Sequence, residues 1–248
     1  MSSGYDASLY EAIAAAEPES FWFRARNRLI VSVVRKHFPD ARSLLEVGCG
    51  TGYVLAGLRE AFPAMRLVGS ELLAEGLELA RRRVPDAELV QLDATDMPFD
   101  AEFDVVGAFD VLEHVEDDER ALAGMRRAAR PGGGVVLLVP QHPRLWSEMD
   151  VVARHARRYT RRDLVAKVER AGFDVVGASS FVSSLLPAMV LSRSVRRLLR
   201  RPYDPVAELT PGALNGVFER VLDGERRLID RGWSLPLGGS LLLVGRAR

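Results

Sequence analysis

Residues 44–52 read Leu-Leu-Glu-Val-Gly-Cys-Gly-Thr-Gly, and this stretch decides the predicted fold. The apolar run 44–47 predicts a buried strand, and an apolar helical pattern begins near Tyr53. Three glycines at alternate positions lie between them, because a sharp turn that brings the backbone close to a ligand requires residues without a Cβ. Strand, glycine turn and helix in this order predict a nucleotide-binding site in an open α/β sheet.

The glycine spacing distinguishes this site from a dinucleotide site. Gly48, Gly50 and Gly52 form Gly-x-Gly-x-Gly, whereas the pyrophosphate fingerprint is Gly-x-Gly-x-x-Gly. Glu46 precedes the first glycine by two positions, where a carboxylate would repel a pyrophosphate and could accept hydrogen bonds from a cationic ligand. The segment resembles the first motif of the class I S-adenosylmethionine-dependent methyltransferases, and in particular the small-molecule, ubiquinone-type members of that family.

Composition excludes several other classes of protein. The chain has 248 residues, which suits one large domain or one domain with a substantial insertion. Its 34 basic and 34 acidic side chains cancel, so no charge footprint for nucleic acid is visible. Cys49 is the single cysteine, which excludes an internal disulfide and a multi-cysteine metal site, and we expect no metal. Residues 1–6 show no secretory signal and no run suits a membrane span, so we expect a cytoplasmic protein.

Strands and helices alternate after residue 42, which predicts an α/β fold with parallel strands and right-handed crossovers. A turn is expected at the Pro-Gly-Gly-Gly run 131–134. The resemblance implies a Rossmann-like, seven-stranded, mostly parallel sheet whose antiparallel last strand lies between strands five and six. The predicted strands are 43–47, 66–70, 87–92, 103–108, 135–139, 173–178 and 240–246, and the predicted helices between them are 53–61, 73–83, 117–129 and 160–171.

The chain divides into four predicted regions. Residues 1–42 form an N-terminal helical lid, 43–180 the cofactor-binding core, 181–235 a helical cap and 236–248 the final strand of the core sheet. The block 179–235 is longer than an ordinary connection between strands. Its first part, 181–201, combines an apolar half with five arginines. We favour a lid over the substrate or a homodimer face for it, ahead of contact with an anionic membrane.

Several candidate cofactor residues follow predicted strands in the order that the methyltransferase resemblance implies. The acid after strand two would bind the adenosine ribose, and the acid after strand three would contact the adenine. An arginine of the N-terminal lid could pair with the methionine carboxylate. The candidate cofactor-binding residues are Arg26, Glu46, Gly48, Gly50, Gly52, Glu71, Leu72, Asp93, Ala94, Phe109 and Asp110.

Histidines mark the region where chemistry would occur. His114 lies in a segment similar to the Leu-Glu-His segment of ubiquinone-type methyltransferases, and His142 and His155 follow strand five. Each is a candidate base for a hydroxyl acceptor, with Tyr159 as a fourth candidate catalytic residue. The alternative is that the loop 150–159 is merely held by salt bridges. The candidate substrate-binding residues are Trp22, Trp146, Arg157 and Arg158.

The sequence therefore predicts an S-adenosylmethionine-dependent methyltransferase that acts on a small, partly hydrophobic molecule, in the manner of enzymes of secondary metabolism. Oxygen is the favoured acceptor atom because the site region contains histidines, and nitrogen and carbon stay open. One alternative is a nicotinamide-dependent oxidoreductase on a related sheet, and another is a non-catalytic S-adenosylmethionine-binding subunit. The balanced charge disfavours a nucleic-acid substrate.

Overall fold

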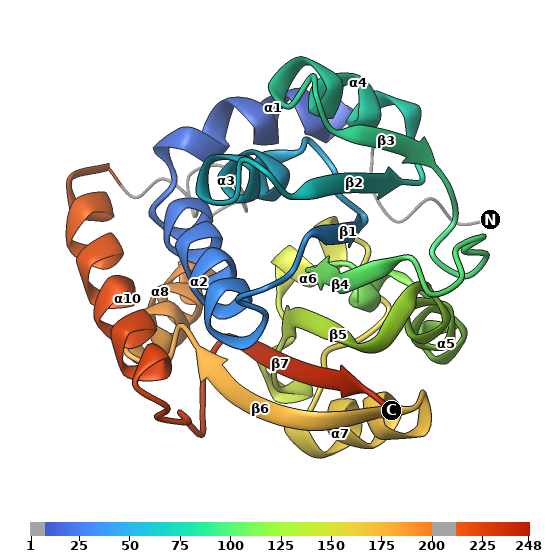
Figure 1. The fold of residues 1–248 in the computed structure, drawn as a ribbon. Helices are drawn as coiled ribbons and strands as arrows, with labels where there is room; N and C mark the ends of the chain where they lie inside the picture. The colour runs from blue at the N-terminus through green and yellow to red at the C-terminus, as the bar shows by residue number, and fades with distance from the viewer. Residues whose placement is uncertain (1–7, 200–211) are drawn as a thin grey trace.

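A computed structural model describes residues 8–199 and 212–248. Its single sheet has the predicted α/β architecture (Figure 1). The strands are β1 (Ser43–Val47), β2 (Arg66–Glu71), β3 (Glu88–Gln91), β4 (Phe103–Phe109), β5 (Ala129–Pro140), β6 (Phe173–Phe181) and β7 (Ser240–Ala247). Their order is β3-β2-β1-β4-β5-β7-β6, and β7 runs antiparallel to both β5 and β6. The predicted sheet and its antiparallel last strand between strands five and six are confirmed.

The central strands are apolar throughout because both faces of the sheet are covered. Successive residues of β1 point to opposite faces, so Leu44 belongs to one core cluster and Leu45 to the other. The cluster around Leu44 includes apolar residues of the helices α2, α3, α4 and α10. The cluster around Leu45 includes those of α5 and α7. These helices are α2 (Phe21–His37), α3 (Tyr53–Ala61), α4 (Ala74–Arg83), α5 (Asp118–Ala128), α7 (Arg161–Arg170) and α10 (Asn215–Asp230).

The remaining elements complete the described chain. The N-terminal region contains α1 (Ser8–Ala16) and the 3-10 turn η1 (Glu17–Glu19) before α2. Three further turns are η2 (Leu112–His114), η3 (Pro143–Leu145) and η4 (Gly212–Leu214), and two further helices are α6 (Glu148–Val152) and α8 (Leu186–Leu198). In the described ranges, no helix combines the length and the apolar character that crossing a membrane requires.

The prediction of a turn at residues 131–134 is wrong, because these residues lie within β5. Ala129 already pairs with Phe103, the register then shifts, and Gly134 pairs with Val105. Gly132 has a φ of 78°, and a Cβ on Gly134 would lie 2.1 Å from the carbonyl oxygen of Gly245. The glycines therefore form an irregularity and allow close approach of β7 instead of ending the strand.

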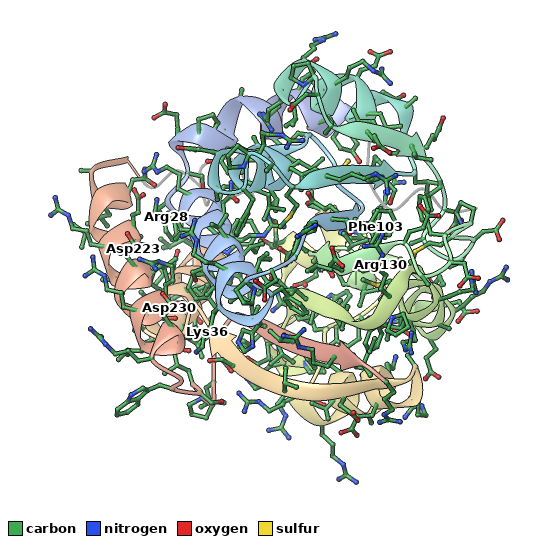
Figure 2. The ribbon with its side chains drawn as sticks, viewed as in Figure 1. Arg28, Lys36, Phe103, Arg130, Asp223 and Asp230 are labelled. Atoms are coloured by element: carbon green, nitrogen blue, oxygen red, sulfur yellow. The ribbon has the colours of Figure 1, made fainter. Side chains whose placement is uncertain are left out.

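Helices from the two ends of the sequence lie side by side. In Figure 1, α10 runs beside α2 on one side of the sheet. Arg28 of α2 bonds Asp223 of α10 at 3.0 Å, and the Lys36 ammonium donates to carbonyl oxygens at the end of α10, including that of Asp230 at 2.9 Å (Figure 2). The predicted N-terminal lid and C-terminal cap are thus held together, although residues 200–211 of the cap lie outside the described part.

Candidate functional site

One large cavity opens at the carboxyl ends of β1, β2 and β4, where ligands of open α/β sheets bind. Its volume is about 1440 Å³, larger than the roughly 300–1,000 Å³ typical of a single ligand pocket. The glycine loop and strand-end acids line one part of it. Side chains of α2, η2, α8 and the loop before α7 line another part. The cavity therefore has room for a cofactor and a second small molecule together.

The glycine loop needs its glycines for two different reasons. Gly48, Gly50 and Gly52 have φ values of 68°, 52° and 76°, which side chains with a Cβ rarely adopt. Gly48 and Gly50 line the cavity, whereas Gly52 lies outside its lining. A Cβ on Gly52 would lie 2.9 Å from the Cα of Ala80, so this glycine permits close packing of the loop against α4.

Glu71 holds the glycine loop and the end of β2 together. Its Oε2 accepts a hydrogen bond from the backbone N–H of Gly50 at 3.0 Å. Its Oε1 accepts from the N–H groups of Leu72 at 2.8 Å and Leu73 at 3.2 Å. The carboxylate lines the cavity, so it is positioned to accept hydrogen bonds from a ribose as well.

Asp93 and Ala94 line the cavity beyond β3, beside Leu72. One carboxylate oxygen of Asp93 accepts from both the backbone N–H and the hydroxyl of Thr95, each at 2.8 Å. These bonds, the backbone bond first, lower the pKa of Asp93, so it is ionised at neutral pH. The predicted adenine-contacting segment is therefore a fixed turn at the edge of the same cavity.

Glu46 supplies an unsatisfied carboxyl oxygen beside the glycine loop. The side chain is buried, lines the cavity, and its Oε2 has no hydrogen-bond partner among the described residues. Burial raises the pKa of Glu46 to about 8, despite the nearby positive charge of Arg26. A buried carboxyl with one unpartnered oxygen fits a cationic ligand group. The methionine part of S-adenosylmethionine carries such a group, so the residues present fit this cofactor.

Arg26 connects the N-terminal helix α2 to the end of β4. Its guanidinium pairs with Asp110 at 2.7 Å, donates to the carbonyl oxygen of Phe109 at 2.7 Å, and lies 5.0 Å from the centre of the Trp22 ring. All four residues line the cavity. The pairing of Arg26 with a methionine carboxylate stays a prediction, and the structure adds that Arg26 and Asp110 neutralise each other.

A second group of titratable side chains faces the cavity from η2 and the loop before α7. One ligand-type atom from each of Glu113, His114 and His155 lies within 4.8 Å of the other two, a spacing at which these groups could surround one cation. The His114 and His155 rings meet edge to face at 4.7 Å. Burial lowers the pKa of His114 to about 3, so this ring is neutral at physiological pH.

His155 is oriented by a fully buried carboxylate. Its Nδ1 lies 2.9 Å from Asp150, which Arg158 also contacts through Nε at 2.6 Å and Nη2 at 3.0 Å. Burial alone would raise the pKa of Asp150, but the hydrogen bonds from His155 and Arg158 outweigh it and lower that pKa. His155 and Arg158 line the cavity, whereas Asp150 does not. Asp150 therefore contributes by holding these two side chains in place.

Four of the eight predicted catalytic and substrate-binding residues lie outside the cavity lining. Tyr159 is fully buried and donates to the Leu112 carbonyl oxygen at 3.0 Å and to Asp118 at 2.7 Å. Arg157 also pairs with Asp118, at 3.0 Å. His142 and Trp146 flank the turn η3 and are not among the residues that line the cavity. The structure therefore gathers His114, His155, Trp22 and Arg158 around the cavity and places the other four elsewhere.

Glu113 is the site residue that sequence reasoning missed. It is fully buried, and it lines the cavity within the turn η2. The available signal was an acid flanked by apolar residues in the segment Val-Leu-Glu-His-Val, residues 111–115, shortly after a strand. An acid buried in such a segment requires a partner or a function.

The sheet order, the antiparallel β7 and the acid before a Gly-x-Gly-x-Gly loop together define a class I S-adenosylmethionine-dependent methyltransferase. Residues 16–178 match the family model described as a methyltransferase domain, and the chain belongs to this family. S-adenosylmethionine is accordingly its cofactor.

Curated relatives include enzymes that methylate different atoms. The chain is 34% identical over 139 residues to a dTDP-3-amino-3,6-dideoxy-alpha-D-glucopyranose N,N-dimethyltransferase of Streptomyces fradiae, covering 54% of this chain and 53% of that protein. It is 32% identical over 172 residues to the O-methyltransferase cnsE of Penicillium expansum, covering 64% of this chain and 61% of that protein. The matches thus span less than two thirds of each relative.

Solved structures show the same fold over nearly the whole chain. A methyltransferase of Thermotoga maritima, described as a possible histamine N-methyltransferase, has a TM-score of 0.60 and 17% identity, covering 97% of this chain and 96% of its own. At this identity the likeness shows the fold alone.

Proposed function

We propose that this methyltransferase acts on a small, partly apolar molecule that it encloses between the core sheet, α2 and α8. The observation that carries the proposal is the size of the cavity, about 1440 Å³, which extends from the glycine loop to η2 and α8. Apolar side chains of α2 and of the α8 region line this second part, among them Phe21, Trp22, Leu185 and Met189.

The cofactor, when bound, supplies an electrophilic methyl group on a sulfonium. The residues that would hold it are Glu46 and the glycine loop beside the methionine part, Glu71 at the ribose, and Asp93 with Ala94 at the adenine. The task of the other residues is to place the acceptor close to the methyl group and to remove a proton where the acceptor requires it, because proximity supplies much of the acceleration.

Two acceptor atoms have support. Oxygen, the atom favoured by the sequence, is supported by the His155–Asp150 pair, since a histidine oriented by a carboxylate can take the proton of a hydroxyl. Nitrogen is supported by the relative from Streptomyces fradiae, whose name describes N,N-dimethylation of an amino sugar. We also propose that the protein acts in the cytoplasm; a homodimer face or membrane contact at α8 stays a prediction.

Calorimetry followed by methyl-transfer assays tests the function. We expect micromolar binding of S-adenosylmethionine and S-adenosylhomocysteine, and transfer of labelled methyl to members of a panel of small amines and matched alcohols. Binding of the cofactor without transfer to any acceptor would favour the non-catalytic subunit. Binding of NAD in place of S-adenosylmethionine would favour the oxidoreductase.

A further inference from the structure

Glu113 is a carboxyl group that the protein buries beside the acceptor part of the cavity without pairing it. The side chain is fully buried, and both carboxyl oxygens lack a hydrogen bond from any other described residue. It follows Asp110 by three residues in the segment after β4. This segment touches the glycine loop, since a Cβ on Gly48 would lie 2.6 Å from Val111. Glu113 is thus close to the cofactor end while facing the second part of the cavity.

The cationic side chains nearest to Glu113 are committed to other carboxylates. Arg26 pairs with Asp110 at 2.7 Å, and Arg158 contacts Asp150 at 2.6 Å and the carbonyl oxygen of Gln141 at 3.2 Å. An unpaired buried carboxyl costs free energy unless a ligand supplies the missing donors. The occupant that fits is therefore a hydrogen-bond donor that carries positive charge.

We propose that Glu113 binds the amino group of the acceptor as an ammonium and then accepts one of its protons, so that the acceptor is a primary or secondary amine. This inference rests on the proposed function and selects nitrogen as the methylated atom. Glu113 is then a catalytic residue, because its carboxylate touches the reacting nitrogen.

The step balances as follows. The ammonium gives one proton to the Glu113 carboxylate, which leaves a neutral amine with a free electron pair. The nitrogen attacks the methyl carbon and forms the C–N bond, and the C–S bond breaks with its electron pair staying on sulfur. The product leaves as a methylammonium ion, with Glu113 still protonated.

The electrostatics of the site agree with this order of events. Burial, and then the neighbouring Asp110, raise the pKa of Glu113 well above its ordinary value, so the site without an amine favours the protonated, neutral acid. An incoming ammonium favours the carboxylate and expels that proton to solvent. The other charged or titratable groups that interact with Glu113 are Asp110, His114, His155, Tyr159, Arg26 and Arg158.

The binding experiment compares two molecules that differ at a single functional group. With the protein saturated with S-adenosylhomocysteine, 2-phenylethylamine and 2-phenylethanol are titrated by calorimetry at pH 7 in buffers of different ionisation enthalpy. The phenyl group suits the aromatic wall formed by Phe21 and Trp22. We expect the amine to bind at least about tenfold more tightly than the alcohol, as a charge-assisted hydrogen bond would produce, with release of about one proton.

The variant Glu113→Gln keeps the size of the side chain and removes its charge. We expect this variant to bind the amine no more tightly than the alcohol and to release no proton. An unchanged affinity for S-adenosylhomocysteine would show that its fold is intact. Glu119→Gln, an exposed acid of α5 that pairs with Arg170 outside the cavity, is the matched control and should keep both the amine preference and the proton release.

Several outcomes overturn the inference. It fails if the wild-type protein shows no preference for the amine, including no binding of either molecule, or if Glu113→Gln retains the preference. Micromolar binding of Zn²⁺ or Mn²⁺ that requires Glu113 and blocks the amine would assign the cluster to a metal ion instead. Methyl transfer to alcohols but not to amines would refute the inference and leave the proposed function standing. Amine binding at Glu113 without transfer to any acceptor would refute the proposed function and the proton-accepting role of Glu113, and would leave Glu113 as an amine-binding residue only.

Discussion

Glu46 places a neutral acid where a cationic cofactor group is to bind. Burial raises its pKa to about 8 from an ordinary value of 4.5, so folding favours the protonated form. The contribution of Glu46 to the free energy of unfolding is therefore greatest below about pH 4.5 and falls as the pH rises to about 8. A bound cation reverses the preference, because it stabilises the carboxylate.

Cofactor binding should consequently release a proton from Glu46 at pH 7. We expect the affinity for S-adenosylmethionine to increase with pH up to about 8 and then to level off. Calorimetry in buffers of different ionisation enthalpy measures the proton directly, and Glu46→Gln should abolish its release. The same proton release in this variant would place the titrating group elsewhere.

Tyr159 has the contacts of a structural residue. We expect Tyr159→Phe to lower the free energy of unfolding by about 1–3 kcal/mol, since it removes the buried hydrogen bond from the hydroxyl to the Asp118 carboxylate at 2.7 Å. Asp118 keeps its ion pair with Lys167 at 2.6 Å. Urea unfolding measures the loss, and the methyl-transfer rate should change less than about twofold. A rate loss of roughly a hundredfold or more would restore Tyr159 as a catalytic residue.

The positions of site residues could be predicted from the sequence where these residues follow the end of a strand. Glu46, Glu71, Asp93 and Asp110 were expected at the carboxyl edge of the sheet, and all line the cavity. Sequence reasoning missed Glu113 because an apolar run does not reveal which of its members faces a cavity. That direction is set by the turn η2 and its packing in three dimensions.

Helix α10 joins the core through a single apolar stripe. Leu222 is fully buried in the core cluster on the α2 side of the sheet, whereas Val217 on the same helix is half exposed. We expect Leu222→Ala to lower the free energy of unfolding by about 2–5 kcal/mol, through lost burial and the cavity it leaves. Val217→Ala should change it by less than about 0.5 kcal/mol. Urea unfolding measures the change in the free energy of unfolding for both substitutions. Equal changes would mean that α10 does not belong to the core.

At the scale of elements, the alternating strands and helices were predicted well because apolar periodicity and burial coincide there. Helix α3 was expected at 53–61 and is Tyr53–Ala61. The predicted turn at residues 131–134 was wrong because, in a sequence, glycines that allow two strands to approach closely cannot be distinguished from glycines that end a strand. Only the contact with Gly245, more than a hundred residues further on, distinguishes the two cases.

S-adenosylhomocysteine, the product that the cofactor leaves after methyl transfer, should stabilise the whole protein. A ligand that binds the native state alone, at about a hundred times its dissociation constant, adds about 2.7 kcal/mol to the free energy of unfolding. For a chain of this length, that corresponds to a rise in Tm of roughly 5–11 °C. We expect this rise with S-adenosylhomocysteine in a thermal melt. Glu71→Ala should show a smaller rise at the same concentration, and an equal rise would mean that Glu71 does not contact the ligand.

The position of β7 between β5 and β6 also dictates an order of assembly during translation. Residues 173–181 leave the ribosome long before residues 240–247, yet β6 pairs only with β7. A nascent chain can therefore build the glycine loop and strands β1–β5 while β6 still waits for a neighbour. Part of the cavity lining around the acceptor is synthesised after β6, including Phe218, Gly239 and Ser240. The cofactor part of the cavity can thus take shape before the acceptor part is complete, and residues near the start of β7 complete the enclosure.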